Sequence, residues 1–153
     1  MKILIATDGS AFSKGAVEKC AELIGERAET AKVISVFETP TPMAVEPFAL
    51  SAEFYGHLEK IAKGRASDAV DSACSILRER CPNIVLDQSR SVELGLPAEV
   101  IVDEAQEWNA DLIVMGSQGH GFWGRVFLGS VSDKVLHHAP CSVLIVRPNK
   151  TQQ

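Results

Sequence analysis

The chain has 153 residues, of which 46% are hydrophobic and 23% are charged, and its formal net charge at pH 7 is −5. This length and composition are typical of one globular domain with a substantial core. The acidic balance and the lack of a lysine or arginine cluster argue against a nucleic-acid-binding surface. No segment reaches the roughly 20 apolar residues of a membrane span, and the apolar start ends at Asp8-Gly9-Ser10, too early for a signal peptide. We therefore expect a cytoplasmic protein that binds neither nucleic acid nor membrane.

The four cysteines, Cys20, Cys74, Cys81 and Cys141, are scattered along the chain. They form no C-x-x-C pair and have no histidine at the spacing of a metal site. One interpretation is a metal site or a redox pair. The other, which the scattered positions favour, is small hydrophobic side chains buried in a protein of a reducing compartment. Cys20 and Cys74 fall on the apolar faces of predicted helices, as the second interpretation requires.

The start of the chain predicts a strand–helix–strand unit. Residues 2–7 form an apolar run, which is typical of a strand buried on both faces. A helix capped by Ser10 or Ser13 follows. Its apolar positions are Ala16, Val17, Cys20, Leu23, Ile24 and Ala28. Residues 32–37 predict a second strand, parallel to the first, and the connection between them is expected to be right-handed.

The middle of the chain predicts a loop, one long helix and an edge strand. Three prolines fall within residues 38–50, which are therefore expected to form a loop. A helix over residues 51–80 is predicted to end at Pro82-Asn83. Its apolar stripe consists of Phe54, Leu58, Ile61, Ala62, Ala66, Ala69, Val70, Ala73 and Leu77. Residues 84–92 predict a third strand, at an edge of the sheet because polar residues interrupt it.

The last third of the chain repeats the alternation of helix and strand. Gly95 and Pro97 mark the start of a helix that carries Val100, Ile101, Ala105 and Trp108. Residues 111–115 predict a fourth strand, and a glycine-rich loop follows it. A short helix over residues 132–138 then leads to a fifth strand over residues 142–146. Residues 149–153 are expected to be a flexible tail after a single domain of residues 1–148.

The order of these elements predicts an α/β fold, a Rossmann-like single domain with a five-stranded parallel sheet and helices on both faces. The expected strand order is 3-2-1-4-5, which makes the first and fourth strands neighbours. Their connections then run to opposite sides of the sheet and open a crevice beyond their carboxyl ends, the usual ligand site of doubly wound proteins. Ala6-Thr7-Asp8 and Gly116-Ser117 stand at these two ends.

The most specific motif lies between the fourth strand and the last helix. Gly116, Gly119 and Gly129-Ser130 are separated by two and nine residues. Glycines let the backbone approach a ligand without a Cβ in the way, and the N–H groups that start a helix bind anions. The pattern therefore predicts a phosphate-binding loop, in which Ser130 and the first helical amides donate to phosphate oxygens. Ordinary loop flexibility is the alternative, which the strand–loop–helix context disfavours.

Asp8 and His120 each allow two interpretations. Asp8 is predicted to hold a ribose hydroxyl or a metal-bound water, and a turn residue bonded to its own backbone is an equal alternative. His120 could be a catalytic base, but no nucleophile or orienting carboxylate stands beside it in the sequence. A solvent-facing or phosphate-adjacent histidine is therefore preferred.

Two further motif matches are weak. Residues 119–124 fit G-x-G-x-x-G, but no acidic residue stands about 20 positions further on to hold a ribose. Residues 124–129 start like a P-loop, but Ser130-Val131 occupy the places where a lysine and a serine or threonine are required. Without that lysine, efficient phosphoryl transfer is poorly supported.

Residues 3–10, 110–117 and 129–146 resemble segments of the universal stress protein family, in its ATP-binding branch. The resemblance covers nearly the whole chain, and the glycine motif is complete. It implies a homodimer that pairs through a fifth strand, Ser142–Val146, and binds ATP or another adenine nucleotide, often with a divalent metal such as Mg or Mn. Two departures are Ala6, where a proline is frequent, and Gln118, where a histidine or arginine is frequent.

The resemblance also implies the residues of the site. The adenosine side would be lined by Ala6, Thr7, Asp8 and Val36. The ribose and phosphates would be held by Met115, Gly116, Ser117, Gly119, His120, Gly121, Gly129, Ser130, Val131 and Ser132. No catalytic residue is predicted, and Asp8, through a water, is the candidate for contact with a metal.

Three functions fit these observations. The first is an ATP-binding regulatory protein of the stress response, with slow or absent hydrolysis and an unidentified protein partner. The second is an adenine-nucleotide-using enzyme of the same fold superclass. Such an enzyme would need an H-x-G-H or S-G-G-x-D-S loop after the first strand, but residues 8–13 read DGSAFS, which disfavours it. The third is a dimeric adaptor with little dependence on nucleotide. The intact glycine motif favours the first.

Overall fold

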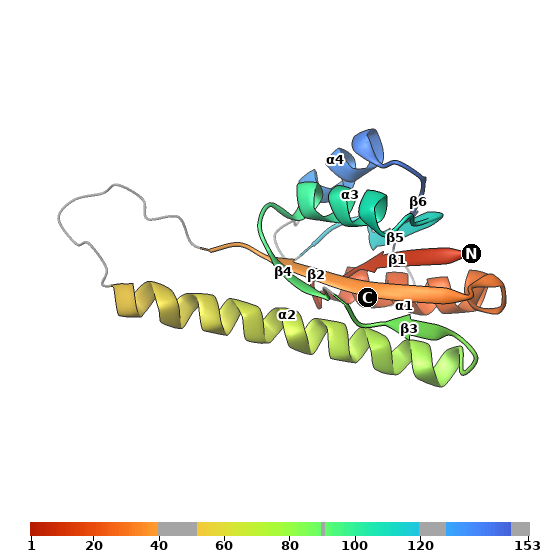
Figure 1. Ribbon diagram of the computed structural model, residues 1–153, viewed down its shortest axis with the longest axis horizontal. Helices are drawn as coiled ribbons and strands as arrows, with labels where there is room; N and C mark the ends of the chain where they lie inside the picture. Colours follow the sequence, from red (N-terminus) through yellow and green to blue (C-terminus); the bar gives the residue numbers. More distant parts are fainter. Residues whose placement is uncertain (40–51, 90, 120–127, 148–153) are drawn as a thin grey trace.

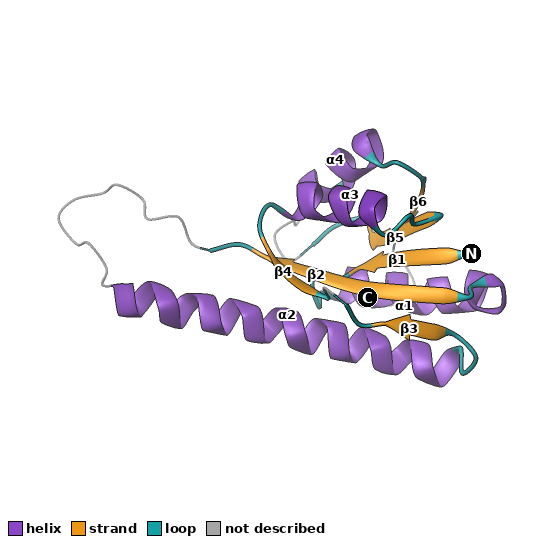
Figure 2. Ribbon diagram, viewed as in Figure 1, coloured by secondary structure: helices purple, strands orange, loops and turns teal. Residues whose placement is uncertain are grey.

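The computed structural model describes residues 1–39, 52–89, 91–119 and 128–147. In these ranges a β-sheet separates α1 and α2 on one face from α3 and α4 on the other (Figures 1 and 2). The elements in chain order are β1 (Lys2–Ala6), α1 (Ala11–Ile24), η1 (Gly25–Arg27), β2 (Thr30–Phe37), α2 (Ala52–Arg80), β3 (Val85–Asp87), β4 (Val92–Leu94), α3 (Pro97–Glu107), β5 (Leu112–Gly116), α4 (Ser130–His138) and β6 (Ser142–Val146). None of the helices in these ranges has both the length and the apolar character that crossing a membrane requires.

The strands are parallel and run in the order β3-β2-β1-β5-β6. This confirms the predicted α/β fold and the predicted order of its five strands. One strand is added, because the predicted third strand over residues 84–92 is two short strands. β3 pairs with the first residues of β2, and β4 pairs with its last residues. Between them the Ser89 amide and hydroxyl donate to Asp87, at 2.9 and 2.7 Å, and this local turn interrupts the strand.

The central strands are apolar throughout because both faces of the sheet are covered. In β1, Ile3 and Ile5 pack on the side of α1 and α2, while Leu4 packs on the side of α3 and α4. This alternation follows from the two-residue period of a strand. In the register of the sheet, Ile3 lies between Ala31 of β2 and Leu112 of β5.

Two of the predicted helical stripes are wrong in part. On α1, Cys20 is buried, but Leu23 is 56% exposed. On α2, the buried side chains begin at Ala66, whereas Phe54 and Ile61 are 42% and 40% exposed. Figure 1 shows the reason for α2, since the first half of this helix extends beyond the ends of the strands. The periodicity identified a helix but not the length over which the sheet covers it.

The described cysteines are free thiols. Cys20, Cys74 and Cys81 are buried, as predicted for the first two, and Cys141 is half-buried. Burial raises the pKa of Cys20 to about 12, which disfavours the reactive thiolate. Among the described residues, no group of three or more His, Cys, Asp or Glu side chains is placed to hold a metal ion.

A buried charged cluster fixes the second half of α3 on the sheet. Lys32 of β2 lies 2.6 Å from Glu104 of α3, and both side chains are at most 4% exposed. The Trp108 indole N–H donates to Asp87 at 2.8 Å, and its ring centroid lies 5.2 Å from the Lys32 ammonium. A buried pair of this kind adds little net stability but specifies one arrangement of the groups it joins. It therefore sets where the other end of α3, at Pro97, stands relative to β2.

Candidate functional site

A cleft of about 410 Å³ opens beyond the carboxyl ends of β1 and β5. These are the neighbouring strands whose connections leave to opposite faces, so the cleft lies where the topology predicts a ligand site. Its volume is within the usual range for small-molecule sites. It is lined by Ala6, Thr7, Asp8, Ser13, Ile34, Val36, Pro97, Ile101, Met115, Gly116, Gln118, Gly119, Gly129, Ser130, Val131 and Ser132.

Most of the site residues predicted from the sequence line this cleft. Ser117 does not, and His120 and Gly121 lie outside the described residues. Ser117 is buried behind the wall, where its N–H donates to Val146 and its carbonyl accepts from the Gly129 N–H at 2.8 Å and the Ser132 hydroxyl at 3.0 Å. Ser117 thus holds the start of α4 against the end of β5, which is a positioning role.

The turn between β1 and α1 is fixed by hydroxyl groups. Ser10 caps α1 by accepting from the Ser13 amide at 3.2 Å, as one of the two predicted caps. The Thr7 hydroxyl accepts from the Gly9 amide at 3.3 Å and lies 3.1 Å from the Ser13 hydroxyl. Gly9 has φ +78°, and a Cβ there would lie 3.2 Å from Ala69 of α2. A larger residue would therefore be strained in this turn.

Asp8 makes the predicted turn bond and also lines the cleft, while its predicted contact with a ribose or a metal-bound water stays a prediction. One carboxylate oxygen accepts from the Ser10 amide at 3.0 Å, which is the local turn bond. The residue also lines the cleft, and its other oxygen lies 2.7 Å from the place that a Cβ on Gly119 would take. Gly119 must therefore lack a side chain for Asp8 to hold this position.

The glycines at the two ends of the motif, Gly116 and Gly129, have different surroundings. A Cβ on Gly116 would lie 2.9 Å from the backbone of Phe12, so this glycine allows β5 to pack against the first turn of α1. A Cβ on Gly129 would meet protein atoms only at 3.4 Å or more, which is ordinary contact. Both glycines line the cleft, and Gly116 also serves packing. That their backbone faces a ligand stays a prediction.

The lining of the cleft combines two kinds of surface. Apolar side chains come from several elements: Ile34, Val36, Pro97, Ile101, Met115 and Val131. The start of α4 also lines the cleft, and Gly129 provides no side-chain cap there, so the first amides of the helix offer N–H groups and the positive end of the helix dipole. The described lining residues include no lysine, arginine or histidine.

Sequence reasoning missed Ser13, Ile34, Pro97, Ile101 and Gln118 as lining residues. Two of them had an available signal. Pro97 and Ile101 are four residues apart on one face of a helix whose start follows a strand end, so the parallel topology places them at the carboxyl edge of the sheet. Ile34 is an interior strand residue, and no sequence feature separates it from the rest of the core.

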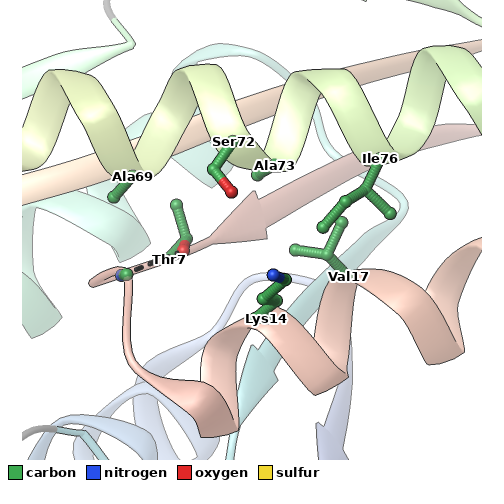
Figure 3. A pocket seen from close by; sticks show the side chains of 8 residues that line it. Thr7, Lys14, Val17, Ala69, Ser72, Ala73 and Ile76 are labelled. Carbon is green, nitrogen blue, oxygen red and sulfur yellow. Dashed lines mark hydrogen bonds between the residues drawn. The ribbon is translucent and has the colours of Figure 1, made fainter.

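A second, smaller cavity lies on the opposite face of the sheet, between α1 and α2 (Figure 3). Its volume is about 50 Å³, and the side chains of Lys14 and Ser72 point into it from the two helices. Thr7 lines both cavities. The smaller cavity has room for a few water molecules only. Of the two cavities, it is the larger cleft that can hold a ligand of nucleotide size.

The fold and the cleft define a doubly wound α/β protein with a cleft at the switch point of its sheet, lined by apolar side chains and by the start of a helix. The chain matches the model of the universal stress protein family over residues 1–147, and it belongs to that family. This confirms the resemblance seen in the sequence.

Individual relatives agree with this assignment. The chain is 37% identical over 145 residues to a universal stress protein of Thermus aquaticus and 31% identical over 153 residues to one of Synechocystis; in both cases the match covers 95% of this chain and 97% of the relative. The solved structure of universal stress protein UspA from Lactobacillus plantarum superposes with a TM-score of 0.77 at 23% identity, covering 96% of this chain and 97% of that one.

Two other solved structures of similar fold contain adenine nucleotides. A universal stress protein in complex with cAMP has a TM-score of 0.64 and 20% identity, and the match covers 96% of each chain. A universal stress protein family protein from Arabidopsis thaliana with AMP bound has a TM-score of 0.65 and 16% identity, and the match covers 98% of this chain and 93% of that one.

Proposed function

We propose that the chain binds an adenine nucleotide, ATP foremost, in the cleft between β1 and β5, and that it acts as a regulatory protein of the cytoplasmic stress response. The observation that carries the proposal is that apolar side chains and a helix start line one cleft of nucleotide size. A purine base is flat and largely apolar, whereas a phosphate tail is an anion that helix N-termini bind. The nucleotide-bound structures of similar fold support the same ligand class.

The residues fit this ligand in a definite orientation. The base would lie on Val36, Pro97 and Ile101, and the phosphates would accept from the amides of Ser130 and Val131. Asp8 would accept from a ribose hydroxyl. Because the described lining offers no cationic side chain, the charge of a triphosphate calls for a counter-ion. We propose Mg or Mn bound to the phosphates, with Asp8 in contact through water.

The same lining argues for slow hydrolysis or none. A phosphoryl-transfer site needs a cation beside the γ-phosphate and a residue that orients the attacking water. Neither a lysine nor an arginine lines the described part of the cleft, and Asp8 already accepts from the Ser10 amide. We therefore expect turnover well below the ~1 per second of ordinary enzymes.

We also propose that the chain forms a homodimer through β6. In the part of the chain that the structure describes, β6 pairs on one side only, with β5. Its residues Val143 to Val146 are partly exposed apolar side chains on a sheet edge. Such an edge favours pairing with another strand, and a twofold axis lets the same edge pair with itself. A nucleotide that alters this dimer would give the protein a means of regulating a partner.

Mass spectrometry of the small molecules released by denaturing the gently purified protein tests the proposal first. We expect stoichiometric ATP, ADP or AMP, together with an increase in the thermal midpoint on adding Mg-ATP. An empty protein with no thermal shift for any adenine nucleotide would refute nucleotide binding and favour the dimeric adaptor. Hydrolysis at ordinary enzyme rates would instead favour the enzyme of the same fold superclass.

A further inference from the structure

The first half of α2 has an apolar face that the sheet does not cover. Phe54 and Ile61 are 42% and 40% exposed, and this end of the helix extends beyond the strands (Figure 1). Residues 52–65 would span about 20 Å of helix. A helical segment of this length is marginal in water, and Gly56 and Gly64 each lower its helix propensity by about 1 kcal/mol relative to alanine. We therefore expect another surface to pack against this face.

The spacing of the face is that of a helix pair. Phe54, Leu58, Ile61 and Arg65 follow one another at intervals of four, three and four residues, which is the seam of a heptad repeat. Leu58 is half-buried and Arg65 is exposed. The seam ends where the buried stripe of α2 begins, at Ala66.

We infer that the occupant of this face is the same face of a second copy of this chain, with the two α2 helices antiparallel. In the register of an antiparallel helix pair, Leu58 packs on the partner's Ile61 and Phe54 lies beside the partner's Arg65. The twofold axis repeats each contact. An arginine guanidinium over an aromatic ring is a favourable cation–π contact, so the one charged residue of the seam gains a partner.

The side chains that flank the seam agree with this arrangement. Tyr55 falls beside the partner's Ala62, and His57 falls beside the partner's Gly64, so a large side chain meets a small one on both sides. This complementarity lets the helices approach closely.

The charges select the antiparallel direction. A parallel pair in register would place Arg65 on Arg65, which is repulsive. Residues 52–58 carry Glu53 as their one formal charge, and residues 59–65 carry Lys60, Lys63 and Arg65 together with Glu59, so the first half is acidic and the second half is basic on balance. In an antiparallel pair each acidic half therefore lies along the partner's basic half.

The contact is expected to be weak by itself. One exposed helical segment per copy buries less than the roughly 800 Å² per partner of a standard interface. It uses a surface other than β6, so it would join copies, or β6-paired dimers, into larger assemblies. Two contacts on one assembly reinforce each other through effective concentration.

Sedimentation velocity over a wide range of concentration tests the inference. The variant Leu58→Asp/Ile61→Asp places charges in the seam, and we expect it to weaken the concentration-dependent association at least tenfold. Leu23→Asp is the matched control, because it alters a leucine of α1 that is 56% exposed, and it should associate as the wild type does. Far-UV circular dichroism checks that all variants fold.

A charge exchange tests the direction and the identity of the partner. Phe54→Arg places two cations together and is expected to weaken association. Phe54→Arg/Arg65→Glu restores opposite charges, and it should recover association to within about threefold of the wild type while becoming sensitive to salt. Identical sedimentation of the wild type and Leu58→Asp/Ile61→Asp would overturn the inference. That result is the one expected if another protein covers this face. A double variant that stays as weak as Phe54→Arg would overturn the antiparallel register.

Discussion

Replacing Gly129 with valine is expected to abolish nucleotide binding and to leave the fold intact. Gly129 has φ −64° and ψ 155°, an extended conformation that β-branched residues adopt readily. A Cβ there meets the nearest protein atoms, of Gln118, Ser117 and Ser132, at 3.4 to 3.5 Å. The change therefore costs the folded protein little, about 1 kcal/mol or less.

The valine methyl groups would occupy the cleft in front of the first amides of α4, where the proposal places the phosphates. Each hydrogen bond between an amide and a charged phosphate contributes about 1.5–3 kcal/mol. The loss of two such bonds costs about 3–6 kcal/mol, which is roughly a 10²- to 10⁴-fold weaker affinity. Gly129→Ala is the graded control, because its Cβ makes ordinary contact with the protein and reaches less far into the cleft; we expect it to lose about tenfold or less.

Isothermal titration calorimetry with Mg-ATP measures both variants against the wild type, and thermal unfolding reports on the fold. A folded Gly129→Val variant that binds ATP within about threefold of the wild type would refute the assignment of the phosphates to the start of α4. A variant that fails to fold would contradict the steric argument at Gly129 instead, so the two errors are distinguishable.

Three further predictions concern stability. Gly25→Ala places a Cβ in overlap with the Cys81 sulfur, so it should lower the free energy of unfolding, measured in urea, by about 1–3 kcal/mol. Adding Cys81→Ala should recover part of the loss, and an unchanged urea midpoint for Gly25→Ala would contradict the overlap. Glu104→Ala removes the carboxylate that lies 2.6 Å from the buried Lys32 ammonium, and it should lower the free energy of unfolding by about 3–5 kcal/mol. The double variant Lys32→Met/Glu104→Leu should lower it by less, and equal losses would contradict the role of the pair. Hydrogen bonds from Ser89, and then from Trp108, lower the pKa of Asp87 to about 2. Ionised Asp87 therefore stabilises the fold above about pH 4, and this contribution is lost as the pH falls toward 2. The difference in unfolding free energy between the wild type and Asp87→Asn should shrink over that window, and a constant difference would contradict the prediction.

The sequence was sufficient for the central strands and for the position of the cleft. Apolar runs such as residues 2–6 and 112–115 are buried on both faces, and a parallel sheet imposes that pattern directly. The strand order then located the switch point. The split of the third strand was not predictable in this way. The strand ends at Asp87, whose carboxylate accepts bonds from Ser89 and from Trp108, which is distant in sequence.

Other features were missed because a periodic pattern does not specify its partner. The stripe of α2 continues through Phe54 and Ile61 as if the sheet covered them, although the strands end first. Likewise, a glycine in a loop indicates that a Cβ is absent but not what takes the space. At Gly116 a Cβ would overlap the backbone of Phe12, whereas at Gly129 it would make only ordinary contacts, the nearest with Gln118.

The two helices that border the cleft are each held at a fixed place before any ligand arrives. The Lys32–Glu104 pair joins the far half of α3 to β2, and Pro97 at the near end of this helix lines the cleft. The start of α4 is tied to β5 by the bonds of Ser117 to Gly129 and Ser132. A site whose two walls are already positioned loses little conformational entropy on binding. This preformed cleft agrees with the proposed binding of a nucleotide with slow hydrolysis or none, because catalysis commonly requires that a site close around the reacting groups.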